Sequence, residues 1–159
     1  MKKIEDYRNA AIELHNKLHF STHPVAIKYI KDKSEIPKTA LWPSKAGFKL
    51  ALCQALTHVR RNGGLIAMTS DDNFCVPATA SHRWADISDE EIIESQLMQR
   101  WHKDRAAEER KLELLKENFT EEERETAGQY SGFLCCPLKD TEFIPDSITI
   151  YCDGEQLTS

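Results

Sequence analysis

Residues 48–73 read FKLALCQALTHVRRNGGLIAMTSDDN, and this stretch contains the pattern on which the predicted fold depends. Apolar side chains recur there at helical spacing and predict an amphipathic helix over 48–61; they are Phe48, Leu52, Leu56 and Val59. Asn62-Gly63-Gly64 predicts the end of this helix, because glycine readily adopts the conformation that closes helices. The apolar run 65–69 then predicts a short buried strand, which leads into the polar turn 70–73.

The rest of the chain predicts further helices and strands on both sides of this unit. Helical periodicity is found over 4–20, after Ser88 and within the charged stretch 103–125. Capping boxes at Ser88-x-x-Glu91 and Thr120-x-x-Glu123 mark two helix starts. Strand-forming residues dominate 25–30, 130–138 and 147–152. We therefore predict an α+β fold, with a mixed sheet of about four or more strands packed against about four helices.

Length and charge limit the classes of protein to be considered. The chain has 159 residues and a net charge of -5, which suits one domain over 1–159 and argues against general nucleic-acid binding. No apolar run reaches the length of a signal peptide or a membrane span, so we expect a cytoplasmic protein without a membrane partner. The sequence leaves open whether the chain forms a homo-oligomer. A turn signal at 153–155 directly after a predicted strand leads us to expect the N-terminal part of a longer protein.

Cysteines provide the main candidates for a functional site. A reducing compartment keeps thiols free, so cysteines there indicate metal, redox or nucleophile chemistry, or simple packing. No pair has the C-x-x-C spacing of a zinc ribbon, so any shared site would have to be assembled from separate elements. The chain contains Cys53, Cys75, Cys135, Cys136 and Cys152.

The local contexts of the cysteines differ. Cys53 lies in the predicted helix 48–61, with Arg60 seven residues on, where a guanidinium would favour the thiolate. Cys75 follows the polar turn and lies close to Asp72. Two further cysteines are adjacent in the predicted strand 130–138. Adjacent strand residues point to opposite faces of a sheet, so only one of these two is expected to face a given site. That pair is Cys135 and Cys136, and Cys152 is expected to be a core residue.

Four motifs in this order resemble a known family. They are PVAIKY at 24–29, LCQAL at 52–56, DDNFC at 71–75 and FLCCPL at 133–138. Together they resemble the uncharacterised ArCR family, a domain of unknown function common in archaea and anaerobic bacteria. The resemblance spans residues 20–152. It implies longer relatives and family-like cysteines at Cys53, Cys75 and one of Cys135 or Cys136, and an anaerobic distribution is compatible with iron–sulfur chemistry.

The leading hypothesis is a site for an iron–sulfur cluster or another thiophilic metal, with a redox or ligand-activation role. Its thiolate ligands would come from Cys53, Cys75, Cys135 and Cys136. Arg60 would offset thiolate charge or hold an anionic ligand, and Asp72 would orient a substrate. The expected partner is a small molecule or a redox protein.

Two alternatives remain open. One is a metal-free module that binds a small molecule or regulates another protein, in which the cysteines only pack. The other is a thiol enzyme with Cys75 as the nucleophile and either His58 or His82 as the base.

Overall fold

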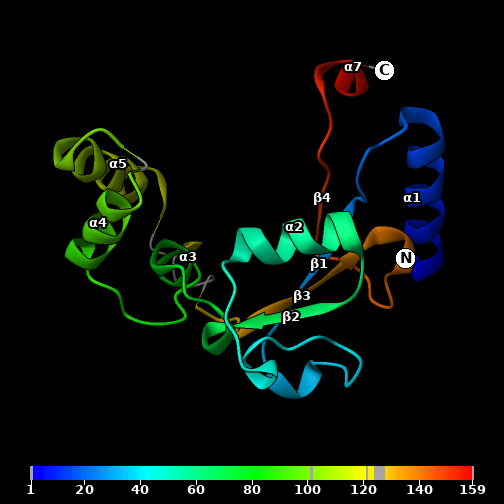
Figure 1. Cartoon of the computed structure of the whole chain (residues 1–159), viewed down its shortest axis with the longest axis horizontal. Coiled ribbons are helices and arrows are strands. Elements are labelled where there is room, and N and C mark those ends of the chain that lie inside the picture. Colours follow the sequence, from blue (N-terminus) through cyan, green and yellow to red (C-terminus); the bar gives the residue numbers. More distant parts are fainter. Residues whose placement is uncertain (1, 101, 121, 124–127, 159) are drawn as a thin grey trace.

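The computed structural model describes residues 2–100, 102–120, 122–123 and 128–158 (Figure 1). Its α-helices are α1 (Ile4–Leu18), α2 (Leu52–Asn62), α3 (Val76–Ser81), α4 (Asp89–Met98), α5 (Arg105–Asn118) and α7 (Gly154–Thr158). Its strands are β1 (Val25–Ile30), β2 (Ile66–Thr69), β3 (Gly132–Pro137) and β4 (Ser147–Thr149). Short 3-10 turns are η1 (Lys33–Glu35), η2 (Ser44–Ala46), η3 (Ser70–Asp72) and η4 (Leu138–Asp140). These elements confirm the α+β class.

The four strands form one sheet in the order β2-β3-β1-β4. Both β1 and β2 pair antiparallel with β3, so β1 and β2 run parallel to each other without touching. The predicted mixed sheet is therefore corrected, since all pairs between the described strands are antiparallel. The reason is that β3, which comes much later in the sequence, lies between the two strands that flank α2. Parallel pairing is found in isolated bridges such as Leu41 to Ile66.

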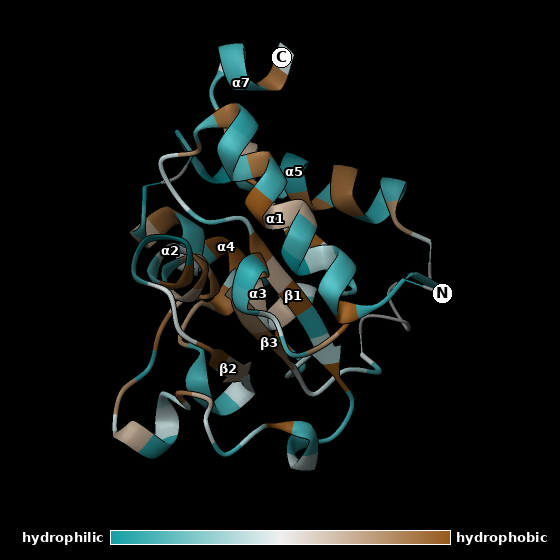
Figure 2. Cartoon of the chain, turned by 90° about the vertical axis from the view of Figure 1, so that its right-hand side faces the viewer, coloured by the Kyte–Doolittle hydropathy of each residue, from teal (hydrophilic) through white to brown (hydrophobic). Residues whose placement is uncertain are grey.

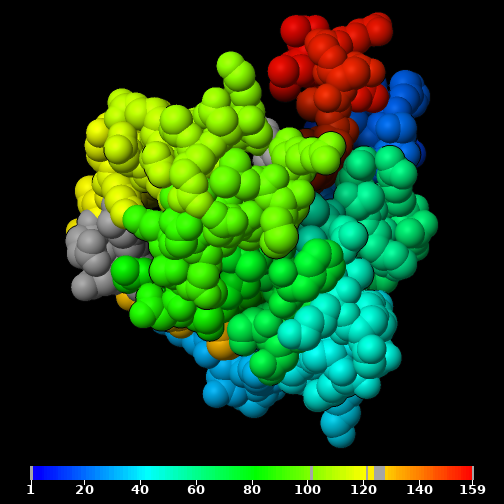
Figure 3. All heavy atoms as spheres, turned by 60° about the vertical axis from the view of Figure 1, so that its left-hand side comes forward, coloured from blue at the N-terminus to red at the C-terminus, as the bar shows by residue number. Residues whose placement is uncertain are grey.

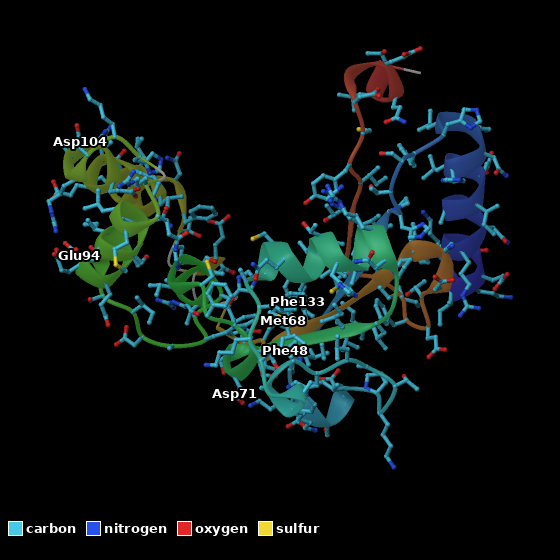
Figure 4. All side chains as sticks on the ribbon, viewed as in Figure 1. Phe48, Met68, Asp71, Glu94, Asp104 and Phe133 are labelled. Atoms are coloured by element: carbon cyan, nitrogen blue, oxygen red, sulfur yellow. The ribbon has the colours of Figure 1, made fainter. Side chains whose placement is uncertain are left out.

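One face of the sheet carries the main core, under α2. Side chains alternate along each strand, so Ile27, Met68 and Phe133 point to this face. They pack against Ala55 and Val59 of α2, and all of these side chains are buried. Figure 4 shows Met68 and Phe133 between α2 and the strands. Burial of this apolar surface supplies the main stabilisation of the fold.

The opposite face of the sheet is covered only in part. At one end, α1 packs through Ala11 against Cys136 and Leu138. Farther along, a cluster built on Ile30 and Leu134 is covered by short segments and not by a long helix. Figure 2 shows mostly hydrophilic residues on the side of α1 that faces the viewer. This second layer is therefore thinner than the first.

Element boundaries differ from the predictions for local reasons. The helix α2 begins at Leu52 and not at Phe48, because Leu50 N–H donates to the Asp72 carbonyl at 2.8 Å and forms a bridge to Asn73. The helix α1 ends at Leu18, since His19 is left-handed with a φ of 49°. Cys152 is exposed, which corrects its predicted place in the core, because β4 ends at Thr149.

The helices α3, α4 and α5 stand to one side of the sheet and form most of the face in Figure 3. Both predicted capping boxes are present: Glu91 N–H donates to Ser88 Oγ, and Glu123 N–H donates to Thr120 Oγ1. Within the α4–α5 pair, Glu108 is fully buried between His102 and Lys111. Among the described residues, none of the helices is long and apolar enough to cross a membrane.

The strand β3 passes β2 closely at Gly132. A Cβ atom at this position would lie far inside the contact distance of the Met68 carbonyl oxygen and 3.0 Å from Thr69 Cγ2. We expect Gly132→Ala to lower the free energy of unfolding by about 1–3 kcal/mol, the usual cost of overpacking. Denaturant unfolding would measure it. Gly154→Ala is the matched control, because no atom lies within 4 Å of its added Cβ, and equal losses in both variants would contradict the close approach.

Candidate functional site

A pocket of about 440 Å³ lies over the sheet face opposite to α2. Lys28 on β1 pairs with Leu134 on β3, and Ala26 pairs with Cys136, so Lys28, Leu134 and Cys136 share this face. These three side chains line the pocket, and Leu65 and Phe143 add apolar walls. We call this hollow the open-face pocket.

The open-face pocket has an apolar interior and a charged rim. One ammonium, Lys28, lines it together with the carboxylates of Glu35, Asp140 and Glu142. Glu35 accepts backbone N–H groups of Asp32 and Lys31, which lower its pKa, with a smaller contribution from Lys28. The other three charged groups of the rim form no hydrogen bond or ion pair with any residue that the structure describes. Such convergent polar groups around an apolar surface are typical of ligand sites.

Two other hollows have less suitable chemistry. A larger one, of about 530 Å³, lies among α3, α4 and α5, and we call it the helical pocket. Both of its lysines already pair: Lys116 contacts Asp89, and Lys111 contacts Glu108 at 2.5 Å. The third, beside α1 and His23, holds only about 110 Å³. The open-face pocket combines ligand-sized volume with an ammonium and two carboxylates that have no ion-pair partner among the described residues.

The two adjacent cysteines lie on opposite faces of β3, as predicted. Cys135 is buried in the core under α2, and burial raises the pKa of its thiol to about 12. Cys136 lines the open-face pocket, and burial is the main cause that raises its pKa to about 11. A hydrogen bond with Thr141 acts in the opposite direction on Cys136. Both thiols therefore stay protonated at neutral pH, in the form that is weak as a nucleophile and as a metal ligand.

Cys53 and Arg60 are on α2 but lie at different ends of it. Cys53 is exposed near the start of the helix. Arg60 is seven residues further, about 10 Å along the axis, and its guanidinium carbon lies 4.3 Å from the centre of the Tyr151 ring. The Arg60 Nε atom is buried without a partner in the described chain. The side chain is therefore stacked against Tyr151, and the structure shows no contact between it and Cys53.

Asp72 is fully buried and points away from solvent. Its carboxylate accepts Thr69 N–H at 2.8 Å, Thr69 Oγ1 at 2.6 Å and Ser44 N–H at 2.7 Å. These three donors hold η3 and the segment before α2 together. The predicted role of Asp72 in binding a substrate stays a prediction, and the observed contacts are structural.

Cys75 is half-buried at the start of α3. Asn73 fixes the backbone there, since its side chain accepts Cys75 N–H and donates to the Cys75 carbonyl at 2.9 Å. His82 caps the other end of α3, roughly 10 Å away by helix geometry, and its ring contacts Trp84 and Phe133. Burial lowers the pKa of His82. His58, the other proposed base, faces Asn62 at 3.3 Å.

The geometry of the predicted cysteines does not fit one shared metal site within this chain. Among the described residues, there is no group of three or more His, Cys, Asp or Glu side chains placed to hold a metal ion. Cys135 and Cys136 are separated by the sheet. Sequence reasoning instead missed the rim of the open-face pocket, whose residues are scattered over 28–143. The one available signal was Lys28, a charged residue within an apolar strand.

Comparison with known proteins agrees with the family resemblance. The model of the uncharacterised ArCR family, a domain of unknown function, matches residues 13–159. The chain belongs to this family. No curated protein and no solved structure matches it. Family membership therefore adds no activity, and the function of this ArCR protein has to be argued from its own residues.

Thiol reactivity should follow burial in this ArCR protein. With iodoacetamide at mildly alkaline pH, we expect the exposed Cys53 and Cys152 to react first, the pocket residue Cys136 to react far more slowly, and Cys135 to react only after unfolding. The pKa values of about 12 and about 11 keep the last two protonated. Peptide mass mapping of native and denatured protein would measure this. Alkylation of Cys135 at the rate of Cys152 would contradict the placement of β3.

Loss of the Asp72 carboxylate should destabilise the protein. Asp72→Ala leaves the N–H groups of Thr69 and Ser44 without their acceptor, and we expect a loss of roughly 3 kcal/mol in the free energy of unfolding. Asp71→Ala is the matched control, because this exposed neighbour only pairs with Lys33 on the surface and should change stability by less than about 1 kcal/mol. Thermal or urea unfolding of both variants distinguishes them.

Proposed function

We propose that this ArCR protein is a binding module for a small organic molecule, which lies in the open-face pocket. The observation that supports it is a set of three charged side chains around the apolar floor of the pocket: Lys28, Asp140 and Glu142. None of the three has a hydrogen-bond or ion-pair partner in the described chain. Charged groups that pair with one another lose much of their capacity to orient a ligand, as Lys111 and Lys116 do at the helical pocket. The proposal corresponds to the metal-free alternative that the sequence left open.

The size and walls of the pocket support the same proposal. A volume of about 440 Å³ is in the range of pockets that hold small molecules. Its floor is a sheet face fixed by pairing of β1 with β3, so the floor is preformed. A preformed floor reduces the conformational entropy that a ligand must overcome on binding.

The state of the thiols also favours binding over metal chemistry in this pocket. Cys136 is the thiol at the pocket, and its pKa of about 11 keeps it neutral at physiological pH. A neutral buried thiol behaves as a small apolar side chain. It can therefore contribute to the floor of the pocket without acting as a ligand to a metal.

The proposal can be tested with 1-hexanol as a neutral probe. In a ¹H–¹⁵N NMR titration, we expect shifts to concentrate on the backbone of Leu134, Cys136 and Phe143. Thr39→Trp should abolish these shifts, because Thr39 lines the pocket and the indole would fill it. Lys38→Trp is the matched control, since it places the same ring on the neighbouring residue, which does not line the pocket.

The same titration can contradict the proposal. Shifts confined to Leu112, Leu115 and Phe119 would move the site to the helical pocket. Shifts at the open face that persist in Thr39→Trp would show that the probe does not enter the pocket. Either result would be sufficient to reject the assignment of function to the open face.

A further inference from the structure

We propose that the open-face pocket selects a small molecule with a protonated amine attached to an apolar body. This inference rests on the proposed function and names the class of its ligand. It is derived from the sign and position of the groups that line the pocket.

The net charge of the side chains that line the pocket is negative. Three carboxylates, of Glu35, Asp140 and Glu142, face a single ammonium, that of Lys28. Glu35 lies close enough to Lys28 to have its pKa lowered by that charge, so these two groups partly compensate each other. The remaining carboxylates, of Asp140 and Glu142, form no ion pair with any residue in the described part of the chain. A cationic group on the ligand would supply the missing partner.

The position of these two carboxylates indicates where the cation would lie. Lys28 is opposite Leu134 in the register, and Cys136 lies two residues further along β3. Asp140 and Glu142 each raise the pKa of the Cys136 thiol, so their charges are near the Cys136 end. Arg8 is also near this end and lowers the same pKa, but its side chain is engaged by Glu5 and by the Thr141 carbonyl. The amine would therefore lie beside Asp140 and Glu142, on the side of the pocket away from Lys28.

The apolar part of the pocket suits the rest of such a molecule. Leu134 forms the floor beyond Cys136, and Leu65 and Phe143 pack against the same cluster from the sides. An alkyl or aryl body lying there would be removed from water, and burial of its apolar surface would favour binding. An anionic ligand is disfavoured, because the carboxylates of Asp140 and Glu142 would repel its charge at the Cys136 end of the pocket.

Three probes with the same body and different head groups test the inference. Hexylamine is protonated at neutral pH, as a lysine side chain is, while 1-hexanol is neutral and hexanoate is an anion. By NMR titration at low salt, we expect hexylamine to bind about fivefold more tightly than 1-hexanol, and hexanoate to bind most weakly. Added salt should reduce the advantage of the amine, because these rim carboxylates are exposed.

Variants assign the selectivity to particular groups. The double variant Asp140→Asn/Glu142→Gln should bind hexylamine and 1-hexanol equally. The matched control Glu109→Gln/Glu113→Gln makes the same change in net charge on α5, and should keep the difference. Lys28→Met should raise the affinity for hexylamine and lower it for hexanoate. This third variant tests the charge argument even if the double variant proves unstable.

Cys136 offers an independent readout. In a Cys53→Ser/Cys152→Ser background, which lacks the exposed thiols, the slow alkylation of Cys136 at about pH 9, where hexylamine is still protonated, should be slowed further by hexylamine. The same reaction should be faster in Asp140→Asn/Glu142→Gln, because loss of the two negative charges lowers the pKa of Cys136.

The possible outcomes separate the two proposals. Equal binding of hexylamine and 1-hexanol at the open face would overturn the amine inference and leave the binding module standing. Binding of none of the three probes at Leu134, Cys136 or Phe143 would overturn both. Tighter binding of hexylamine that is unchanged in Asp140→Asn/Glu142→Gln would reject these carboxylates as the cause.

Discussion

The structure depends on the insertion of β3 between β1 and β2. All six residues of β3 are buried, and the strand pairs on both edges, so its backbone groups are satisfied only by its two neighbours. Gly132 allows β3 to approach the Met68 carbonyl where β2 ends. Without this central strand, β2 would be separated from β1 and β4, and neither the core under α2 nor the floor of the open-face pocket would exist.

The same strand explains why the cysteines do not form one site. Alternation along β3 places Cys135 in the core and Cys136 on the open face, and burial keeps both thiols protonated. Two adjacent cysteines in a strand therefore lie in two different environments and cannot act on the same ligand. Cys136 adds to the open face as a neutral, compact side chain, while charged groups from elsewhere in the chain surround it.

Local features of the sequence predicted much of the fold. Helical periodicity located α1 and α2, and strand-forming residues located β1 and β3. The capping boxes at Ser88 and Thr120 were confirmed because such boxes need only residues close in sequence. The sheet order could not be predicted, since the position of β3 depends on pairing between distant segments. The start of α2 was missed for the same reason: Leu50 pairs with the η3 segment, a contact that helical periodicity does not contain. The rim of the pocket is equally non-local.

The difference between the two faces of the sheet accounts for where a site can form. A continuous helix, α2, covers one face and fills it with apolar side chains. The other face is crossed by η1, η4 and their connections, which are too short to cover it fully. Such connections bring exposed polar side chains to the edge of an apolar surface, and this is why loops on rigid scaffolds so often carry binding groups. Asp140 and Glu142 are such residues, because they lie within five residues of the end of the central strand and line the pocket over the open face of the sheet.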